Sequence, residues 1–218
     1  MRLDLLLGRI LLAHPEKPDF KRRRIACIGD SITFGAGVTE TRKTDAWPVL
    51  WQNLLGKSFQ VLNYGVSGAT LQDETSFPYR KIGFLRRLKA ASPELIVLML
   101  GTNDSKPYNW NEPRFMREYE KLITEFLSPA KPSRLVLMVP PKAFPEEETG
   151  IIAFDTQDDV IQDNIRPIIL SLGEKYSLQV IDLYTFTETH PEWFLDGVHP
   201  NREGNIAIAE HMFRELTL

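Results

Sequence analysis

The feature that most constrains the fold of this chain is an uninterrupted apolar run near its middle. Six consecutive apolar residues occupy 95–100, and Gly101 with small polar residues follows at once. A strand that is apolar at every position has to be covered on both faces, which is typical of the central strands of parallel sheets. The run therefore predicts a central strand at 95–100, in an α/β fold with helices on both sides of the sheet.

Further strand-like runs alternate with helix-like segments along the chain. We expect the other strands at 25–28, 60–63, 135–139 and 179–183. Apolar residues at helical spacing predict helices between and after them, at 46–55, 78–91, 115–126, 161–176 and 202–216. This alternation predicts a flavodoxin-like three-layer α/β/α sandwich with a five-stranded parallel sheet. The polar stretches at 39–45 and 142–155 are expected to be loops, the second of them a long insertion.

Net charge and cysteine content argue against nucleic-acid binding and against an internal disulfide. The chain has 218 residues and a net charge of -3, so it lacks the basic surface that nucleic-acid binding requires. Cys27 is the only cysteine, which excludes an internal disulfide and fits a reducing compartment. Its position within an apolar run predicts a buried side chain rather than a reactive thiol.

The N-terminal segment is rich in leucine, but charged residues interrupt it. Asp4 and Arg9 lie within 3–13, no small-residue cleavage site follows, and the stretch is too short to span a bilayer. We therefore expect a short helix in a non-catalytic extension, residues 1–23, ahead of a single domain at 24–218. No membrane span is expected, and the expected location is cytoplasmic.

Small polar residues follow three of the expected strands, at 29–31, 63–68 and 101–104. In an open parallel sheet the carboxyl ends of the strands lie at one edge, where ligands bind. Ser31 stands where a strand gives way to the first turn of a helix, and the free N–H groups there suit a hydroxyl nucleophile whose attack generates an oxyanion. One alternative is a simple helix cap. Another is a phosphate cradle, although the Lys-Ser/Thr ending and the Gly-x-Gly-x-x-Gly spacing of such cradles are missing.

A serine nucleophile needs a base, and one histidine has a carboxylate at a suitable spacing. His199 lies three residues after Asp196 in a loop shaped by Gly197 and Pro200, so the carboxylate can fold back onto the imidazole and orient it. The alternative is an ordinary loop before a helix capped by Asn201. The other histidines are expected to be structural or at the surface, and they are His14, His190 and His211.

Together these segments resemble the GDSL-type, or SGNH, hydrolase superfamily. Its blocks occur in order over roughly residues 24–216, as Gly29-Asp30-Ser31-Ile32 (with Ile in place of Leu), Gly68, Asn103 and Asp196-Gly197-Val198-His199-Pro200. The resemblance implies that Ser31 is the nucleophile, His199 the general base and acid, and Asp196 the orienting carboxylate. It also implies an oxyanion hole made by the backbone N–H groups of Ser31 and Gly68 and the side-chain amide of Asn103. Gly68 is expected to be glycine so that its amide approaches the substrate without a Cβ in the way.

The resemblance also indicates a substrate class. Residues 101–110 are similar to a branch of carbohydrate O-acetyl esterases that includes sialate-type esterases, so we expect hydrolysis of short-chain, chiefly acetyl, esters through an acyl-enzyme on Ser31. Candidate pocket residues are Asp30, Tyr108, Trp110 and Pro141. Tyr108 and Trp110 either form an aromatic wall for a sugar or pack beneath their loop. A lysophospholipase or acyl thioesterase is the alternative within the superfamily, and a flavodoxin-like cofactor-binding protein is the alternative from a different class.

No cofactor and no metal ion are expected. The acidic run at 146–148 has no neighbouring histidine or cysteine, and we expect it to be a solvated loop. The expected partner is a small-molecule or saccharide ester, whereas nucleic acid is not expected. Self-association into a homo-oligomer stays open.

Overall fold

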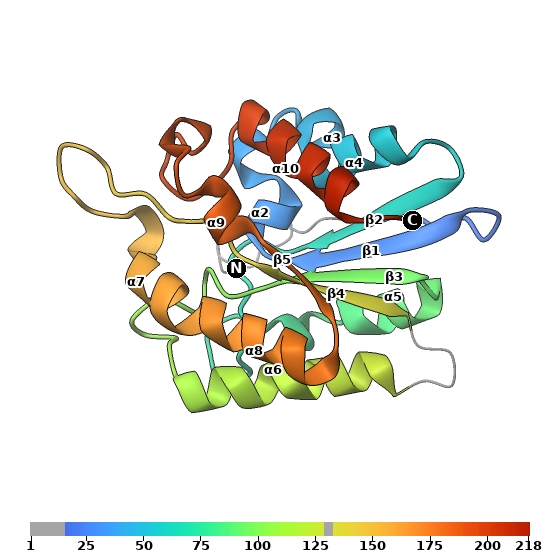
Figure 1. Cartoon of the computed structure of the whole chain (residues 1–218), viewed down its shortest axis with the longest axis horizontal. Coiled ribbons are helices and arrows are strands. Elements are labelled where there is room, and N and C mark those ends of the chain that lie inside the picture. Colours follow the sequence, from blue (N-terminus) through green and yellow to red (C-terminus); the bar gives the residue numbers. More distant parts are fainter. Residues whose placement is uncertain (1–15, 129–132) are drawn as a thin grey trace, which may run out of the picture.

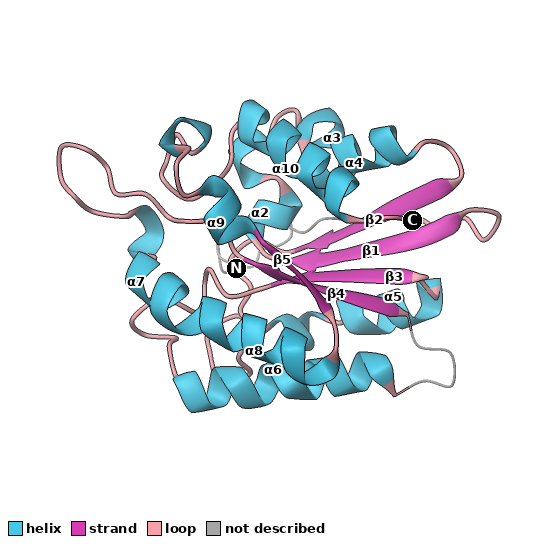
Figure 2. Ribbon diagram, viewed as in Figure 1, coloured by secondary structure: helices cyan, strands magenta, loops and turns pink. Residues whose placement is uncertain are grey.

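The computed structural model describes residues 16–128 and 133–218, so the helix expected in the leucine-rich stretch at 3–13 lies outside the described residues. Five parallel strands form one sheet in the order β2-β1-β3-β4-β5 (Figure 1). Their bounds are β1 Arg23–Gly29, β2 Phe59–Gly65, β3 Leu95–Met99, β4 Arg134–Val139 and β5 Gln179–Asp182. This strand order, with helices on both faces, confirms the predicted flavodoxin-like sandwich (Figure 2).

The central strand is the one that the apolar run predicts. β3 lies between β1 and β4, and all five of its residues are buried. Val97 on β3 is in register with Cys27 on β1 and with Val136 on β4. Burial raises the pKa of the Cys27 thiol, which agrees with the expected unreactive side chain.

Helices cover the two faces of the sheet as separate layers. α4 Trp47–Leu55 and α10 Arg202–Glu215 lie on one face, whereas α5 Phe84–Ala91, α6 Glu112–Leu127 and α8 Arg166–Tyr176 lie on the other (Figure 1). Alternate residues of the strands supply the two cores, because successive side chains of a strand point to opposite faces. Val97 belongs to the core that contains Trp47 and Trp51, and Ile96 belongs to the core that contains Phe115.

Short elements connect these layers. The short α-helices are α2 Ser31–Phe34, α3 Arg42–Asp45, α7 Asp158–Val160 and α9 Leu183–Thr187. Single 3-10 turns lie at η1 Ala36–Val38, η2 Tyr79–Ile82, η3 Ala153–Asp155 and η5 Pro191–Trp193, and one π turn, η4, lies at Ile161–Ile165. Within the part of the chain that the structure describes, no helix is both long enough and apolar enough to cross a bilayer.

Some of these elements differ from the sequence expectations. The stretch at 39–45 contains α3 rather than only a loop. The helix expected at 78–91 is divided, because Gly83 adopts a left-handed φ of 85° between η2 and α5. β5 ends at Asp182, whose side chain accepts a hydrogen bond from the backbone N–H of Thr185 and so starts α9.

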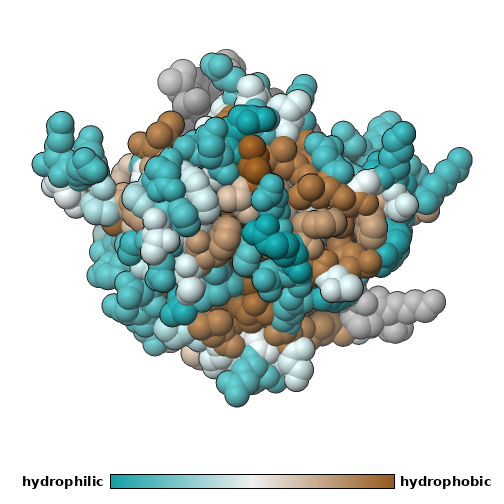
Figure 3. All heavy atoms as spheres, turned by 45° about the horizontal axis from the view of Figure 1, so that its top comes forward, coloured by the Kyte–Doolittle hydropathy of each residue, from teal (hydrophilic) through white to brown (hydrophobic). Residues whose placement is uncertain are grey.

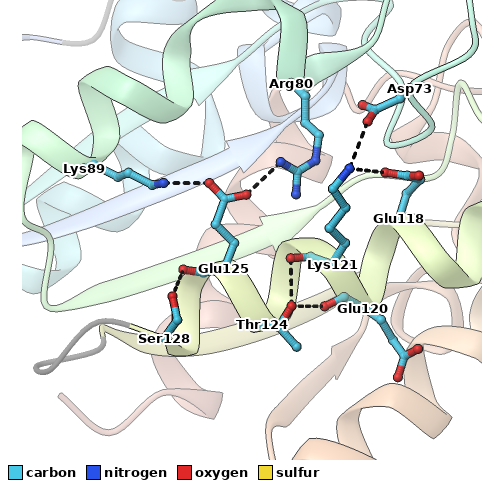
Figure 4. Close-up of polar contacts among 9 residues, drawn as sticks. All are labelled: Asp73, Arg80, Lys89, Glu118, Glu120, Lys121, Thr124, Glu125 and Ser128. Carbon is cyan, nitrogen blue, oxygen red and sulfur yellow. Dashed lines mark hydrogen bonds and ion pairs between the residues drawn. The ribbon is translucent and has the colours of Figure 1, made fainter.

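A group of ion pairs fastens α6 to α5 and to the segment that precedes α5 (Figure 4). The Glu125 carboxylate accepts hydrogen bonds from Arg80 at 2.7 Å and from Lys89 at 2.6 Å. Lys121 lies 3.7 Å from Asp73 and 3.4 Å from Glu118. Exposed ion pairs individually contribute little stability. Their effect here is positional, since they join α6 to residues 73–89.

Candidate active site

Ser31 occupies the first position of α2, directly after the carboxyl end of β1. Asp30 caps this helix, and its Oδ1 accepts a hydrogen bond from the backbone N–H of Ile32 at 2.9 Å. The backbone N–H of a first helical residue has no partner within the helix, so the N–H of Ser31 remains a donor for a ligand. Burial raises the pKa of the enclosed Asp30 carboxyl, while the hydrogen bond from the backbone N–H of Ile32 opposes that rise.

A chain of hydrogen bonds joins the three residues that the sequence assigns to a triad. Ser31 Oγ lies 2.8 Å from His199 Nε2, and His199 Nδ1 lies 2.7 Å from Asp196 Oδ2. The second oxygen, Asp196 Oδ1, accepts the backbone N–H groups of His199 at 2.7 Å and Val198 at 3.0 Å. The carboxylate therefore folds back onto its own turn, with one oxygen on the imidazole and the other on the backbone.

The electrostatics of this turn favour a charged carboxylate. Partial burial works to raise the pKa of Asp196, but hydrogen bonds from the side chain and backbone of His199 outweigh it and lower the pKa from 3.8 to about 2. An ionised Asp196 accepts Nδ1–H, which leaves the Nε2 lone pair of His199 directed at Ser31. This arrangement can remove a proton from the serine hydroxyl and stabilise the imidazolium that results.

Close backbone packing holds the turn at 196–199, which we call the acid–base turn, against the residues that follow Ser31 and α2. A Cβ at Gly37 would overlap the carbonyl oxygen of Pro200, the residue after His199. On the other side, the backbone N–H of Phe144 donates to the carbonyl of Gly197 at 2.8 Å. The turn is therefore held between residues that follow α2 and residues that begin the long insertion.

Gly68 and Asn103 lie beside Ser31 and line the same cavity. Asn103 Nδ2 donates to the carbonyl of Ala69 at 3.2 Å, which ties the amide to the residue after Gly68. An amide nitrogen carries two hydrogens, so one remains for a ligand. Gly68 has a φ of 80°, and a Cβ there would meet only a Phe77 ring carbon at 3.7 Å. The left-handed φ gives a second, backbone reason for glycine at this position, beside the expected approach of the substrate to its amide.

A buried carboxylate fastens the two loops that carry these donors. Asp104, which follows Asn103, accepts the backbone N–H groups of Leu71 at 2.9 Å and Gln72 at 3.0 Å. Burial raises the pKa of Asp104 to about 6, against the effect of those hydrogen bonds. The positions of Gly68 and Asn103 are therefore coupled through Asp104 as well as through Ala69.

The cavity over Ser31 is small, with a volume of about 230 Å³. Drug-sized ligands occupy pockets of about 300–1,000 Å³, so this space suits a short acyl group. Besides Ser31, Gly68, Asn103 and His199, it is lined by residues that the sequence did not identify, namely Ala36, Ser67, Thr102, Lys106, Phe154, Thr156 and Val198. Most of these residues lie next to motif residues in the sequence, and that proximity could have identified them as lining residues. Phe154 and Thr156 come from the insertion and its end. The sequence offered the insertion up to Asp155 either as a wall of the site or as a dimer contact, but no motif singled out these two residues.

The four candidate pocket residues do not line this cavity. Asp30 is buried beneath it as the cap of α2. Trp110 packs against Phe115 with ring centroids 5.4 Å apart, so it joins the core rather than a sugar-binding wall. Tyr108 is 65% exposed to solvent, and Pro141 is buried.

The described histidines outside the turn have structural contacts. His190 stacks on Trp193 with ring centroids 3.9 Å apart and pairs with Glu192, whereas His211 stacks on Phe186 at 4.0 Å. Across residues 16–128 and 133–218, no group of three or more His, Cys, Asp or Glu side chains is arranged to hold a metal ion. The acidic run at 146–148 is exposed.

Known proteins resemble this chain in sequence. A model of the GDSL-like Lipase/Acylhydrolase family matches residues 27–206. An acetylxylan esterase of Xylanibacter ruminicola is 33% identical over 206 residues, which are 86% of this chain and 42% of that protein. The chain thus spans less than half the length of that relative.

Solved structures share the fold at lower identity. A carbohydrate acetylesterase family member from Sinorhizobium meliloti superposes with a TM-score of 0.72 at 22% identity, over 88% of this chain and 96% of that chain. The lipase/acylhydrolase from Enterococcus faecalis superposes with a TM-score of 0.72 at 24% identity, over 88% of this chain and 94% of that chain. At these identities the likeness concerns the fold.

Proposed function

The chain belongs to the GDSL-like lipase/acylhydrolase family, and from this premise we propose that it is a serine esterase that removes short acyl groups, chiefly acetyl, from a carbohydrate. The observation that carries the proposal is the hydrogen-bond chain from Ser31 through His199 to Asp196. The acetyl group and the carbohydrate are supported by the acetylxylan esterase relative. The small cavity over Ser31 supports a short acyl chain.

In the acylation step, Ser31 Oγ attacks the ester carbonyl carbon while His199 Nε2 takes the hydroxyl proton. The carbonyl oxygen becomes an oxyanion, which the N–H groups of Ser31 and Gly68 and the free Nδ2–H of Asn103 stabilise. Asp196 stabilises the imidazolium. The tetrahedral intermediate then expels the sugar alkoxide, which receives the proton from Nε2, and the acyl group remains on Oγ.

Deacylation uses the same groups in reverse. His199 Nε2 takes a proton from water, and the resulting hydroxide attacks the acyl carbonyl within the same set of donors. Collapse of this second intermediate releases the carboxylic acid and returns the proton to Ser31 Oγ. The same three donors serve both oxyanions, because the carbonyl carbon stays attached to Ser31 between the two steps.

Domain organisation, location and assembly remain proposals. We infer that residues 24–218 act as a single hydrolase domain, with residues 1–23 as an extension. The cytoplasmic location stays a prediction, and self-association into a homo-oligomer stays open. Self-association draws support from exposed apolar side chains such as Leu54 on α4 and Phe213 on α10, and the space-filling view shows hydrophobic areas between hydrophilic ones (Figure 3).

The test is a Ser31→Ala variant assayed on an acyl series. We expect wild-type protein to release acetate from ethyl acetate and acetylated xylo-oligosaccharides, and to act more slowly on longer acyl chains. Ser31→Ala should lower kcat by up to about a millionfold, as for other serine nucleophiles. Ser128→Ala, at an exposed site beyond α6, is the matched control and should retain full activity.

Mass spectrometry of protein quenched during turnover should find one acetyl group on the peptide that contains Ser31. Full activity of Ser31→Ala would contradict the proposed nucleophile. A maximum rate with long acyl chains would instead favour the lysophospholipase or thioesterase alternative.

A further inference from the structure

Phe154 is an aromatic residue in an unusual backbone conformation at the edge of the cavity. Its φ is 62° and that of the next residue, Asp155, is 57°. Two consecutive non-glycine residues in the left-handed region are uncommon, because each side chain meets steric resistance there. Burial does not compensate for this strain, since 52% of Phe154 remains exposed. Such strain, when it persists, points to a functional constraint on the position of the side chain.

The strained backbone carries the Phe154 ring to the site described above. Phe154 lines the cavity together with Ser31, Asn103 and His199. The centroid of its ring lies 5.1 Å from that of the His199 imidazole, and the two planes meet at 65° in a T-shaped contact. This contact accounts for only part of the ring surface, and the exposed remainder is available to a ligand that enters the cavity.

The segment that carries Phe154 is anchored at both ends to loops of the active site. At its start, the backbone N–H of Phe144 donates to the carbonyl of Gly197. At its end, the backbone N–H of Gln157 donates to Ser105 Oγ at 3.1 Å, and Ser105 lies two residues after Asn103. The insertion therefore runs as a long loop from the acid–base turn to the Asn103 loop (Figure 1). The ring is held in place by both sides of the site.

We propose that Phe154 is the aromatic platform on which the sugar carrying the acetyl group packs. This inference rests on the proposed function and names the residue that selects carbohydrate over simple alkyl esters. A pyranose ring presents C–H groups on its face, and packing that face on an exposed aromatic ring removes apolar surface from water. In this proposal the acetyl group enters the cavity, and the sugar, as the leaving group, packs outside it on the exposed part of the Phe154 ring.

Other aromatic residues near the site are less suited to this role. Trp110 is packed against Phe115, and Tyr108 does not line the cavity.

Ile151 lies in the insertion that carries Phe154 and is 67% exposed, but it lines a neighbouring groove with Glu146 and Leu195 instead of the cavity over Ser31. Ile151 is therefore a matched control for substitutions in this loop.

The experiment compares Phe154→Leu, which removes the ring but keeps an apolar side chain, with Phe154→Tyr, which retains the ring. Acetylated xylobiose is the sugar ester and ethyl acetate is the ester without a ring. We expect Phe154→Leu to raise KM for acetylated xylobiose about tenfold, as loss of apolar contact area predicts. Because the ring also contacts His199, some loss on ethyl acetate is expected, and it should be clearly smaller than the loss on the sugar ester. Phe154→Tyr and Ile151→Ala should resemble the wild type on both esters.

A binding measurement separates substrate contact from catalysis. In a Ser31→Ala background, calorimetry should show that Phe154→Leu weakens binding of acetylated xylobiose by a factor similar to the rise in KM. An equal loss of kcat/KM on both esters would overturn the proposal, because it would assign Phe154 to the orientation of the imidazole. Unchanged KM and unchanged binding of the sugar would overturn it as well. In either case, ethyl acetate hydrolysis that depends on Ser31 would leave the proposed function intact.

Discussion

Replacement of Asn103 by alanine tests whether its side-chain amide acts in the reaction or only supports the loop. One Nδ2 hydrogen is used in a 3.2 Å bond to the carbonyl of Ala69, and the other is free to meet an oxyanion. Loss of one oxyanion donor lowers kcat by about a hundred- to a thousandfold, or about 2.7–4 kcal/mol of transition-state stabilisation. KM should change little, because the donor is needed mainly after charge has developed.

The same substitution also has a structural cost that can be estimated from the geometry. The Ala69 carbonyl is buried and loses a long hydrogen bond, which predicts a loss of about 1 kcal/mol in the free energy of unfolding. A matched control is Asn111→Ala. Asn111 caps α6, its Oδ1 accepts the backbone N–H of Arg114 at 3.0 Å, and its loss should also cost about 1 kcal/mol.

The assay measures kcat and KM for ethyl acetate and the free energy of unfolding in urea for both variants. We expect similar destabilisation of the two proteins but a large loss of kcat only in Asn103→Ala. Asn103→Ala could instead retain kcat within a few-fold of the wild type while its free energy of unfolding falls as in Asn111→Ala. The amide would then serve only to hold the Ala69 carbonyl, and the three-donor oxyanion hole would be refuted.

Two further substitutions probe the acid–base turn. Asp196→Asn should lower kcat by about ten-thousandfold, because the imidazole is no longer held in the productive tautomer; near-normal turnover would refute the assigned role. The folded-state pKa of Asp196 is about 2, below its ordinary 3.8, so its ionised form stabilises the fold above that ordinary value and the stabilisation is lost as pH falls toward 2. A plot of Tm against pH should therefore fall less steeply in this interval for Asp196→Asn than for the wild type, and identical slopes would count against the shift. Gly37→Ala places a methyl group against the Pro200 carbonyl, so we expect the free energy of unfolding to fall by about 1–3 kcal/mol. We also expect a lower kcat, because His199 is displaced. A fully active, equally stable variant would show that this packing is not required.

Local sequence patterns were enough to predict the sheet and the contact between Asp196 and His199. β3 is apolar at every position, and that property depends only on burial in the middle of a sheet. Asp196 and His199 are close in sequence, so their contact follows from the geometry of one turn. The encounter of Ser31 with His199 followed from topology together with the family resemblance, because the two lie 168 residues apart.

Features set by tertiary contacts could not be predicted in the same way. Trp110 follows the Asn103 motif closely, yet its orientation depends on the partner that α6 offers in Phe115. Phe154 lies in an insertion without periodicity, and its left-handed φ has no glycine to signal it. The end of β5 was also missed, since Leu183 is buried whether it continues the strand or begins α9.

The turn at 196–199 closes on itself, and this has a consequence for how such proteins can change. Both oxygens of Asp196 form hydrogen bonds with residues within the next three positions, so the acid and the base are aligned within one turn. Neighbouring segments position the turn as a whole, but they do not align Asp196 with His199. Lineages and protein engineers can therefore remodel the loop between Phe144 and Phe154 to admit new alcohols, provided that the contacts of Phe144 with Gly197 and of Phe154 with His199 are kept.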